Sequence, residues 1–171
     1  MTAPAVPSVS ARPLPDAPTP GLSQVWSLVP PRLHHAERLA GWSRSPQEAA
    51  AWASQPEHPF PPALVVSWWE RPDVQPWLLI DPGGAPVAYG ELWDDEQEDE
   101  VELARLIVDP ARRREGVGRR LVDHLVARAR AAGRGACSLR VVPDNTGAIA
   151  LYRSAGWSED DTQWYAVTLA P

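Results

Sequence analysis

A strand that runs into a glycine-containing helix start is the feature that most constrains this chain. Residues 106–121 begin with an apolar strand, cross an arginine-rich loop, and enter a helix at Gly116 and Gly118. The first N–H groups of a helix lack partners within it, and glycine leaves room for a ligand to approach them. The helix dipole and nearby guanidinium groups both favour an anion. The turn is therefore predicted to bind a phosphate or pyrophosphate, with an ordinary tight turn as the alternative.

The surrounding apolar pattern predicts one α/β domain. Predicted helices span residues 32–40, 45–53, 118–132 and 146–155. Predicted strands span residues 25–29, 63–69, 77–80, 87–93, 101–108, 138–142 and 163–169. This order predicts an α/β sandwich around a mixed central sheet, with helices that cross between neighbouring strands. The turn lacks the Gly-Lys-Ser/Thr of a P-loop and the three-glycine dinucleotide fingerprint, so neither of those nucleotide folds is expected.

The first 20 residues differ in composition from the rest. They hold six of the 20 prolines among Ala, Ser and Thr, and such a segment buries too little apolar surface to offset its ordering entropy. We expect residues 1–20 to be a mobile tail and residues 21–171 to form the domain. A start-site or linker remnant without function is the simplest interpretation of the tail.

Charge is divided sharply along the chain. The 16 basic residues are all Arg, and against 22 acidic residues they give a net charge of −6. Nine of the arginines lie within 112–140, whereas eight carboxylates lie within 91–102. A negative total argues against nucleic acid as a partner. Without a membrane-spanning stretch or signal peptide, and with Cys137 as the single cysteine, a soluble cytoplasmic protein is expected.

Two blocks of residues carry a family resemblance. The first consists of Val108-Asp109-Pro110 followed by Arg113-x-x-Gly116-x-Gly118. The second is Asn145-x-x-Ala148-x-x-Leu151-Tyr152-x-x-x-Gly156-Trp157. In this order they resemble the acyl-CoA-binding motif and a later motif of the GNAT superfamily, the Gcn5-related N-acetyltransferases, with Trp157 where Phe is commoner. The resemblance covers residues 101–157 and implies the GNAT fold. In that fold a mixed, mostly antiparallel central sheet is flanked by helices, and two central strands splay apart.

The resemblance also implies an acetyl-CoA site. Backbone groups of Leu106, Ile107 and Val108 would bind the pantetheine arm like an added strand. The pyrophosphate would be held by main-chain N–H groups of the turn, at Arg114, Glu115, Gly116, Val117, Gly118 and Arg119. Arg113 would hold the loop, and Asn145 would bond to the cofactor arm.

Two catalytic residues follow from the same resemblance. Tyr152 matches the general acid that protonates the departing thiolate; the alternative is a tyrosine packed on a helix face. Glu102 lies eleven positions before Arg113, where some family members place a glutamate base, although a solvated charge is equally expected. Glu91 and Glu100 are the reserve candidates for the base, and strand alternation places Glu100 on the same face as Glu102.

The expected acceptor is a primary amine of a small molecule or peptide. The acidic run at 91–102 favours a cationic acceptor such as a polyamine, an amino sugar or a peptide N-terminus, unless it is merely a solvated hairpin. Trp68, Trp69 and Trp93 are the aromatic residues best placed to stack on it. The ribosomal-protein N-terminal acetyltransferases usually carry Glu where this chain has Arg140, which makes that subgroup less expected.

Alternatives to this function remain. The chain could bind CoA as a regulatory protein without catalysis, or use another acyl-CoA. No metal is expected, because the neighbouring His34 and His35 cannot share one helix face. Cys137 is expected to be a core thiol rather than a nucleophile. Either a monomer or a homodimer is compatible with the sequence.

Overall fold

A computed structural model describes residues 25–95, 99–159 and 164–169, so the predicted tail at 1–20 lies outside the described residues. The helices are α1 (Ala36–Ala40), α2 (Pro46–Ala53), α3 (Pro62–Trp69), α4 (Val117–Ala131) and α5 (Thr146–Ser154). The strands are β1 (Ser27–Val29), β2 (Val74–Ile80), β3 (Pro86–Asp95), β4 (Glu100–Val108), β5 (Ala136–Arg140), β6 (Ser158–Glu159) and β7 (Trp164–Thr168). Among these elements, no helix is long and apolar enough to cross a membrane.

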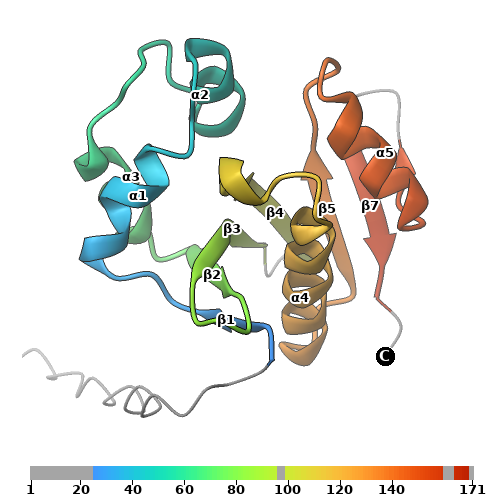
Figure 1. The fold of residues 1–171 in the computed structure, drawn as a ribbon. Helices are drawn as coiled ribbons and strands as arrows, with labels where there is room; N and C mark the ends of the chain where they lie inside the picture. Colours follow the sequence, from blue (N-terminus) through green and yellow to red (C-terminus); the bar gives the residue numbers. More distant parts are fainter. Residues whose placement is uncertain (1–24, 96–98, 160–163, 170–171) are drawn as a thin grey trace, which may run out of the picture.

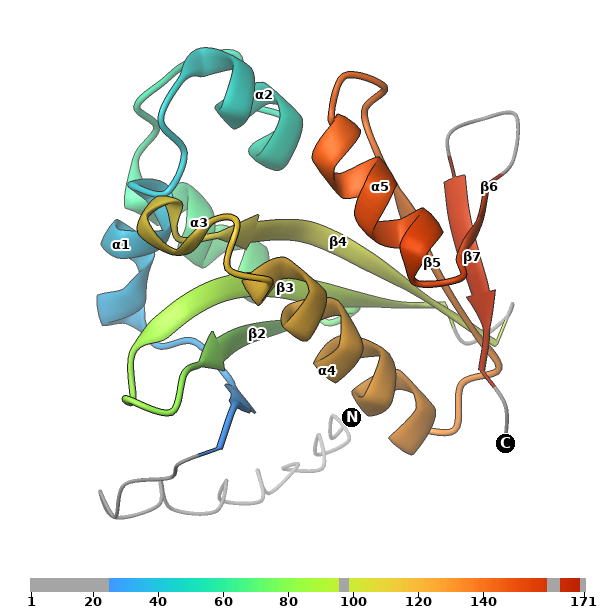
Figure 2. The ribbon, with the colours of Figure 1, turned by 45° about the vertical axis from the view of Figure 1, so that its right-hand side comes forward.

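The described strands form one mixed sheet in the order β1-β2-β3-β4-β5-β7-β6. Every neighbouring pair is antiparallel except β4 and β5, which run parallel and are joined through α4. Helices α4 and α5 lie in front of the sheet in Figure 2, whereas α1, α2 and α3 gather on its other side, at the left in Figure 1. The predicted α/β architecture, with a mostly antiparallel sheet flanked by helices, is confirmed.

The two parallel strands separate soon after they meet. β4 pairs with β5 only through Glu100 to Glu102, opposite Ala136 to Ser138. Beyond that point β4 continues to Val108, paired with β3 alone, and the two strands diverge in Figure 2. The predicted splay of the central strands is therefore present, and within the described residues it leaves one edge of β4 without a neighbouring strand.

One predicted strand is wrong, because residues 63–69 form α3. Its β-branched and aromatic residues are typical of strands, yet the helix begins with Pro62 in its first turn, where proline is well tolerated. Val65 and Trp68 are buried one helical turn apart and pack against the sheet. Tertiary burial of this face outweighs the intrinsic strand preference.

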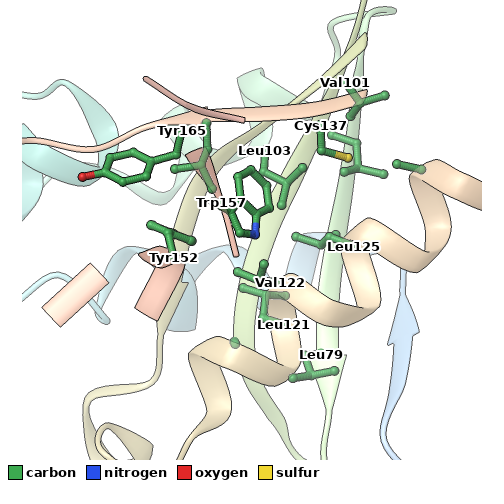
Figure 3. Packing of buried hydrophobic residues seen from close by; sticks show 14 of the residues in the cluster. Leu79, Val101, Leu103, Leu121, Val122, Leu125, Cys137, Tyr152, Trp157 and Tyr165 are labelled. Carbon is green, nitrogen blue, oxygen red and sulfur yellow. The ribbon is translucent and has the colours of Figure 1, made fainter. Parts of the chain in front are cut away.

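The sheet divides the apolar core into two clusters. On one face, Leu121, Val122 and Leu125 of α4 turn toward the strands and lie close to Trp157 (Figure 3). On the other face, α1, α2 and α3 pack over Leu78 and other residues of the sheet. Each fully buried aliphatic side chain contributes about 1.5–3 kcal/mol. Both clusters include residues of β4, so packing on its two faces holds the strand in place beside β3.

Candidate active site

The arginine-rich turn ends at an open helix N-terminus. Gly116 adopts a left-handed conformation, with φ of 77°, and no side chain caps α4 among the described residues. The Arg120 N–H reaches back to the Gly116 carbonyl at 3.2 Å. The N–H groups of Val117, Gly118 and Arg119 precede this first helical hydrogen bond, and the first N–H groups of a helix have no partner carbonyl within it. An open helix N-terminus of this kind can accept an anion, so the phosphate site stays a prediction that this geometry allows.

Two arginines of this turn form hydrogen bonds and ion pairs with distant parts of the chain. Arg113 donates to both carboxylate oxygens of Glu48 on α2, at 2.8 and 3.1 Å, and also to the carbonyls of Trp42 and Val108. The Arg113 hydrogen bond is the main reason that the pKa of Glu48 is lowered. Arg112 binds Asp81 at 2.6 Å. Arg113 thus ties the end of β4 to α2, in keeping with its predicted role of holding the loop.

The open edge of β4 leads directly to the turn. Leu106, Ile107 and Val108 occupy the last part of β4, beyond its pairing with β5. A Cβ added at Gly118 would come within 3.6 Å of Val108 and of Leu151 on α5. Gly118 therefore lies where β4, α4 and α5 approach one another. The three segments predicted to bind acetyl-CoA are brought together on one side of the molecule.

Helix α5 carries the second predicted motif. Asn145 is its N-cap, and the side-chain oxygen accepts from the Ala148 N–H at 3.2 Å. Tyr152 is buried in the α4-side cluster, with its ring 5.7 Å from that of Trp157 and 5.8 Å from that of Tyr165. Burial raises the pKa of Tyr152 well above its ordinary value, so the phenol keeps its proton at neutral pH.

Glu102 lies at the point where β4 and β5 separate. It pairs with Trp93 on β3 and with Ser138 on β5. Burial raises the pKa of its carboxyl above 4.5, and the negative charge of Glu100 adds to the increase, although Arg140 and Arg105 oppose it. A half-buried carboxylate with a raised pKa is suited to accept a proton near neutral pH.

Glu91, a reserve candidate for the base, instead belongs to a buried polar network. Its side chain is 0% exposed and accepts hydrogen bonds from Tyr89 at 2.5 Å, Trp93 at 2.6 Å and Arg105 at 2.7 Å. Burial and then the Glu91 charge raise the pKa of Tyr89, which keeps this phenol a donor. The Trp69 N–H extends the network by donating to Tyr89 at 3.0 Å. The sequence places these residues near one another in β3 and β4, but gives no sign of the network.

The tryptophans are distributed differently from the prediction. Trp68 belongs to α3 and is buried in the core, and Trp69 donates to Tyr89. Neither of these two tryptophans is therefore a free surface for stacking. Trp93, the third, lines a cavity together with Glu102. Trp164 of β7 lines the same cavity and was missed, because nothing in the local sequence links residue 164 to Glu102.

Three further predictions concern Cys137, a metal site and the acyl-CoA. Cys137 is buried, and burial raises the pKa of its thiol to about 11, as expected for a core thiol. No group of three His, Cys, Asp or Glu side chains suited to a metal ion occurs in the described parts of the chain. The residues present fit an acyl-CoA: an open strand edge, then a glycine turn and an uncapped helix N-terminus rich in arginine.

The fold and the order of the two motifs along it are those expected of an acyltransferase. The sequence model of the acetyltransferase (GNAT) family matches residues 37–157, so the chain belongs to that family and is an acyltransferase.

Curated relatives match shorter segments. The ribosomal protein bS18-alanine N-acetyltransferase of Escherichia coli (strain K12) is 41% identical over 61 residues, which are 36% of this chain and 41% of the relative. The IAA acetyltransferase of Azospirillum brasilense is 33% identical over 89 residues, which are 52% of this chain and 58% of the relative. The matches therefore span less than two thirds of each relative.

Solved structures share the fold over most of the chain. Spermidine N-acetyltransferase from Vibrio cholerae, in complex with CoA and spermine, has a TM-score of 0.72 and 14% identity, covering 85% of this chain and 96% of its own. The ribosomal-protein-S18-alanine N-acetyltransferase of Escherichia coli has a TM-score of 0.62 and 20% identity, covering 86% and 96%. At these identities the likeness establishes the fold.

Proposed function

We propose that the protein is an acetyl-CoA-dependent N-acetyltransferase that acts on a primary amine of a small molecule or peptide. One observation carries this proposal: the open edge of β4 connects Glu102, at the divergence from β5, to the uncapped N-terminus of α4. A linear ligand with an acyl group at one end and phosphates at the other matches that layout. The acyl end would lie beside the carboxylate, and the phosphates would lie at the turn.

The donor site uses backbone more than side chains. Leu106, Ile107 and Val108 supply N–H and C=O groups along the open edge, as an added strand requires. The turn from Arg114 to Arg119 supplies helix N-terminal N–H groups for the pyrophosphate. Asn145 stands at the start of α5, where it would meet the cofactor arm. Bound acetyl-CoA supplies the activated acyl group as a thioester.

Glu102 and Tyr152 move the two protons of the reaction. An amine attacks as its neutral form, so Glu102 accepts the proton that the ammonium loses, and its raised pKa suits that task. The new N–C bond forms as the C–S bond breaks, and Tyr152 donates its phenolic proton to the sulfur. The second proton, which the nitrogen loses as it becomes an amide, passes through solvent to the Tyr152 phenolate and restores the acid. The raised pKa of Tyr152 keeps that proton available until the thiolate develops. Glu91 is not assigned to this step, because its carboxylate is bound by three neighbours.

An acceptor with a positive charge is favoured by the carboxylates near Glu102. Asp94, Asp95 and Glu100 lie around the same cavity as Glu102. Opposite charge raises the local concentration of a cation and its rate of encounter. Arg140 stands at the position where ribosomal-protein acetyltransferases usually have Glu, so a free amine is favoured over a ribosomal-protein N-terminus.

The function is tested by thiol release from acetyl-CoA, succinyl-CoA and longer acyl-CoAs, each combined with a panel of amines. We expect release that needs both acetyl-CoA and an amine, with the N-acetylated amine found by mass spectrometry. Release with only a longer acyl-CoA would assign a different acyltransferase. Binding of acetyl-CoA by calorimetry without any release would point to the regulatory alternative. No binding of any acyl-CoA would contradict the proposed function altogether.

A further inference from the structure

A polar cavity opens on the face of the sheet that α4 and α5 do not cover. Val101 and Leu103 belong to the α4-side core, so the alternation of the strand turns Glu102 to the opposite face. The cavity there has a volume of about 350 Å³. It is lined by Trp93, Asp94, Asp95, Glu100, Glu102, Ser138 and Trp164.

Ser138 provides an observation independent of the carboxylates. It is only 5% exposed, and its hydroxyl has no hydrogen-bond partner among residues 25–95, 99–159 and 164–169. It lies opposite Glu102 in the pairing of β4 and β5, and it lines the cavity. Buried hydroxyl groups nearly always have a partner, so this one is suited to a polar atom of a ligand.

Glu100 and Glu102 form no ion pair with another described residue, although the charges of Arg140 and Arg105 act on Glu102. Asp94 is paired with Arg134 at 2.6 Å. Glu100 and Glu102 project from alternate positions of β4 and repel each other, which contributes to the raised pKa of Glu102. Alternate residues of a strand are about 6–7 Å apart. Two cationic groups at that separation would each meet one carboxylate.

Aromatic rings line the cavity from both sides. Trp93 comes from β3 and Trp164 from β7, and these strands lie on either side of the β4–β5 pair. Guanidinium groups already lie over both rings: Arg71 at 5.0 Å and Arg105 at 4.9 Å from the centre of Trp93, and Arg140 at 5.8 Å from that of Trp164. The indoles therefore serve the cavity as apolar walls, which suit the alkyl chain of an amine that is charged only at its ends.

We propose that this cavity is the acceptor site and that the acceptor is a short aliphatic diamine. One nitrogen lies at Glu102 and reacts, while the second ammonium pairs with Glu100. The Ser138 hydroxyl accepts a hydrogen bond from the reacting amine, and the tryptophans flank the alkyl chain. A four-carbon diamine matches the separation of the two carboxylates. This inference rests on the proposed function, because it assigns the acceptor of that same reaction.

Calorimetry on the full chain, with and without saturating CoA, tests the site apart from catalysis. The probes are 1,4-diaminobutane and 1-aminobutane, which differ in one ammonium group. We expect the diamine to bind at least tenfold more tightly. Glu100→Gln should abolish this preference, whereas Glu37→Gln, which removes an exposed carboxylate of α1 outside the cavity, should preserve it. Ser138→Ala should weaken both amines.

Equal binding of the two amines, or a preference that survives Glu100→Gln, would overturn the diamine assignment. Unchanged binding in Ser138→Ala would overturn the role of its hydroxyl. Thiol release from acetyl-CoA separates the two proposals. Acetylation of 1-aminobutane as efficient as that of the diamine would retain the activity but overturn this acceptor. Tight diamine binding without thiol release would retain the site and overturn the activity.

Discussion

Arg105 and Glu91 form an ion pair inside the sheet, with a guanidinium nitrogen 2.7 Å from a carboxylate that is 0% exposed. Arg105 has a left-handed φ of 46°, at the place where the pairing of β3 and β4 shifts register. Its guanidinium lies 4.3 Å from the ring centre of Trp68 and 4.9 Å from that of Trp93. The Trp52 N–H donates to the Arg105 carbonyl at 2.8 Å. This pair holds the irregular part of β4 between Glu102 and the open edge.

Glu91→Gln is expected to destabilise the fold. It leaves the Arg105 guanidinium buried without its counter-charge, a loss of about 3–5 kcal/mol in the free energy of unfolding. Urea denaturation at neutral pH measures it. As a control, Asp123→Asn removes an exposed ion pair with Arg119 on α4 and should cost less than about 0.5 kcal/mol. Equal, small effects of the two substitutions would contradict a structural role for the buried pair.

Glu102→Gln is expected to lower kcat by about 10²–10⁴-fold and to remove the acidic limb of the pH–rate profile. Because burial raises the pKa of Glu102, the wild-type limb should lie above pH 4.5. Glu100→Gln lines the same cavity and serves as the matched variant; its profile should keep the limb. Loss of the limb in Glu100→Gln alone would move the base to that residue.

The same pKa shift predicts the stability of the Glu102→Gln variant. Burial makes the folded chain bind the Glu102 proton more tightly than the unfolded chain does. The carboxylate form therefore costs stability above the raised pKa, and this cost disappears as the pH falls through it. Glu102→Gln removes the cost and should unfold at neutral pH no more easily than the wild type. A large loss of stability would mean that its activity loss reports misfolding.

Tyr152→Phe is expected to reduce kcat by about 10²–10⁴-fold and to leave the Kd of acetyl-CoA unchanged. The ring contacts with Trp157 and Tyr165 persist in the variant, so packing is preserved. Tyr165→Phe changes a neighbouring phenol of the same cluster and should retain kcat. Steady-state kinetics and calorimetry measure the two quantities. If Tyr152→Phe keeps the wild-type kcat, its phenol is a packing group and not the acid.

Gly118→Ala is expected to weaken the binding of acetyl-CoA without destabilising the fold. The added methyl would lie 3.6 Å from Val108 and from Leu151, an ordinary contact distance, so the protein should tolerate it. Alanine in a helix gains up to about 1 kcal/mol over glycine, and thermal unfolding should show equal or higher stability. The methyl would nevertheless occupy space between the end of β4 and α5, and the Kd of acetyl-CoA should rise at least tenfold. An unchanged Kd would place the donor elsewhere.

The parts of the fold that local sequence dictates could be predicted. The strand, arginine loop, Gly116 and helix are contiguous, and their chemistry depends on backbone geometry within about one helical turn. Helix α5 begins at Thr146, where the sequence predicts it, and Glu100 shares a face with Glu102 as strand alternation requires. In each case the deciding interactions lie within a few residues along the chain.

What could not be predicted depends on contacts between distant segments. Residues 63–69 have strand-forming side chains, yet burial of one face against the sheet makes them a helix. The hydrogen-bonded ion pair between Arg113 and Glu48 joins residues 65 positions apart. Trp164 reaches the Glu102 cavity only because β7 pairs with β5. Such relationships have no periodicity or motif in the sequence.

Thiol release from acetyl-CoA in the presence of 1,4-diaminobutane, with the product identified by mass spectrometry, tests the central claim most directly. The proposed mechanism predicts one thiol released for each mono-acetylated diamine formed, with the rate greatly reduced in Glu102→Gln and in Tyr152→Phe. Absence of acetylated amine across the whole amine panel, despite acetyl-CoA binding, would contradict it.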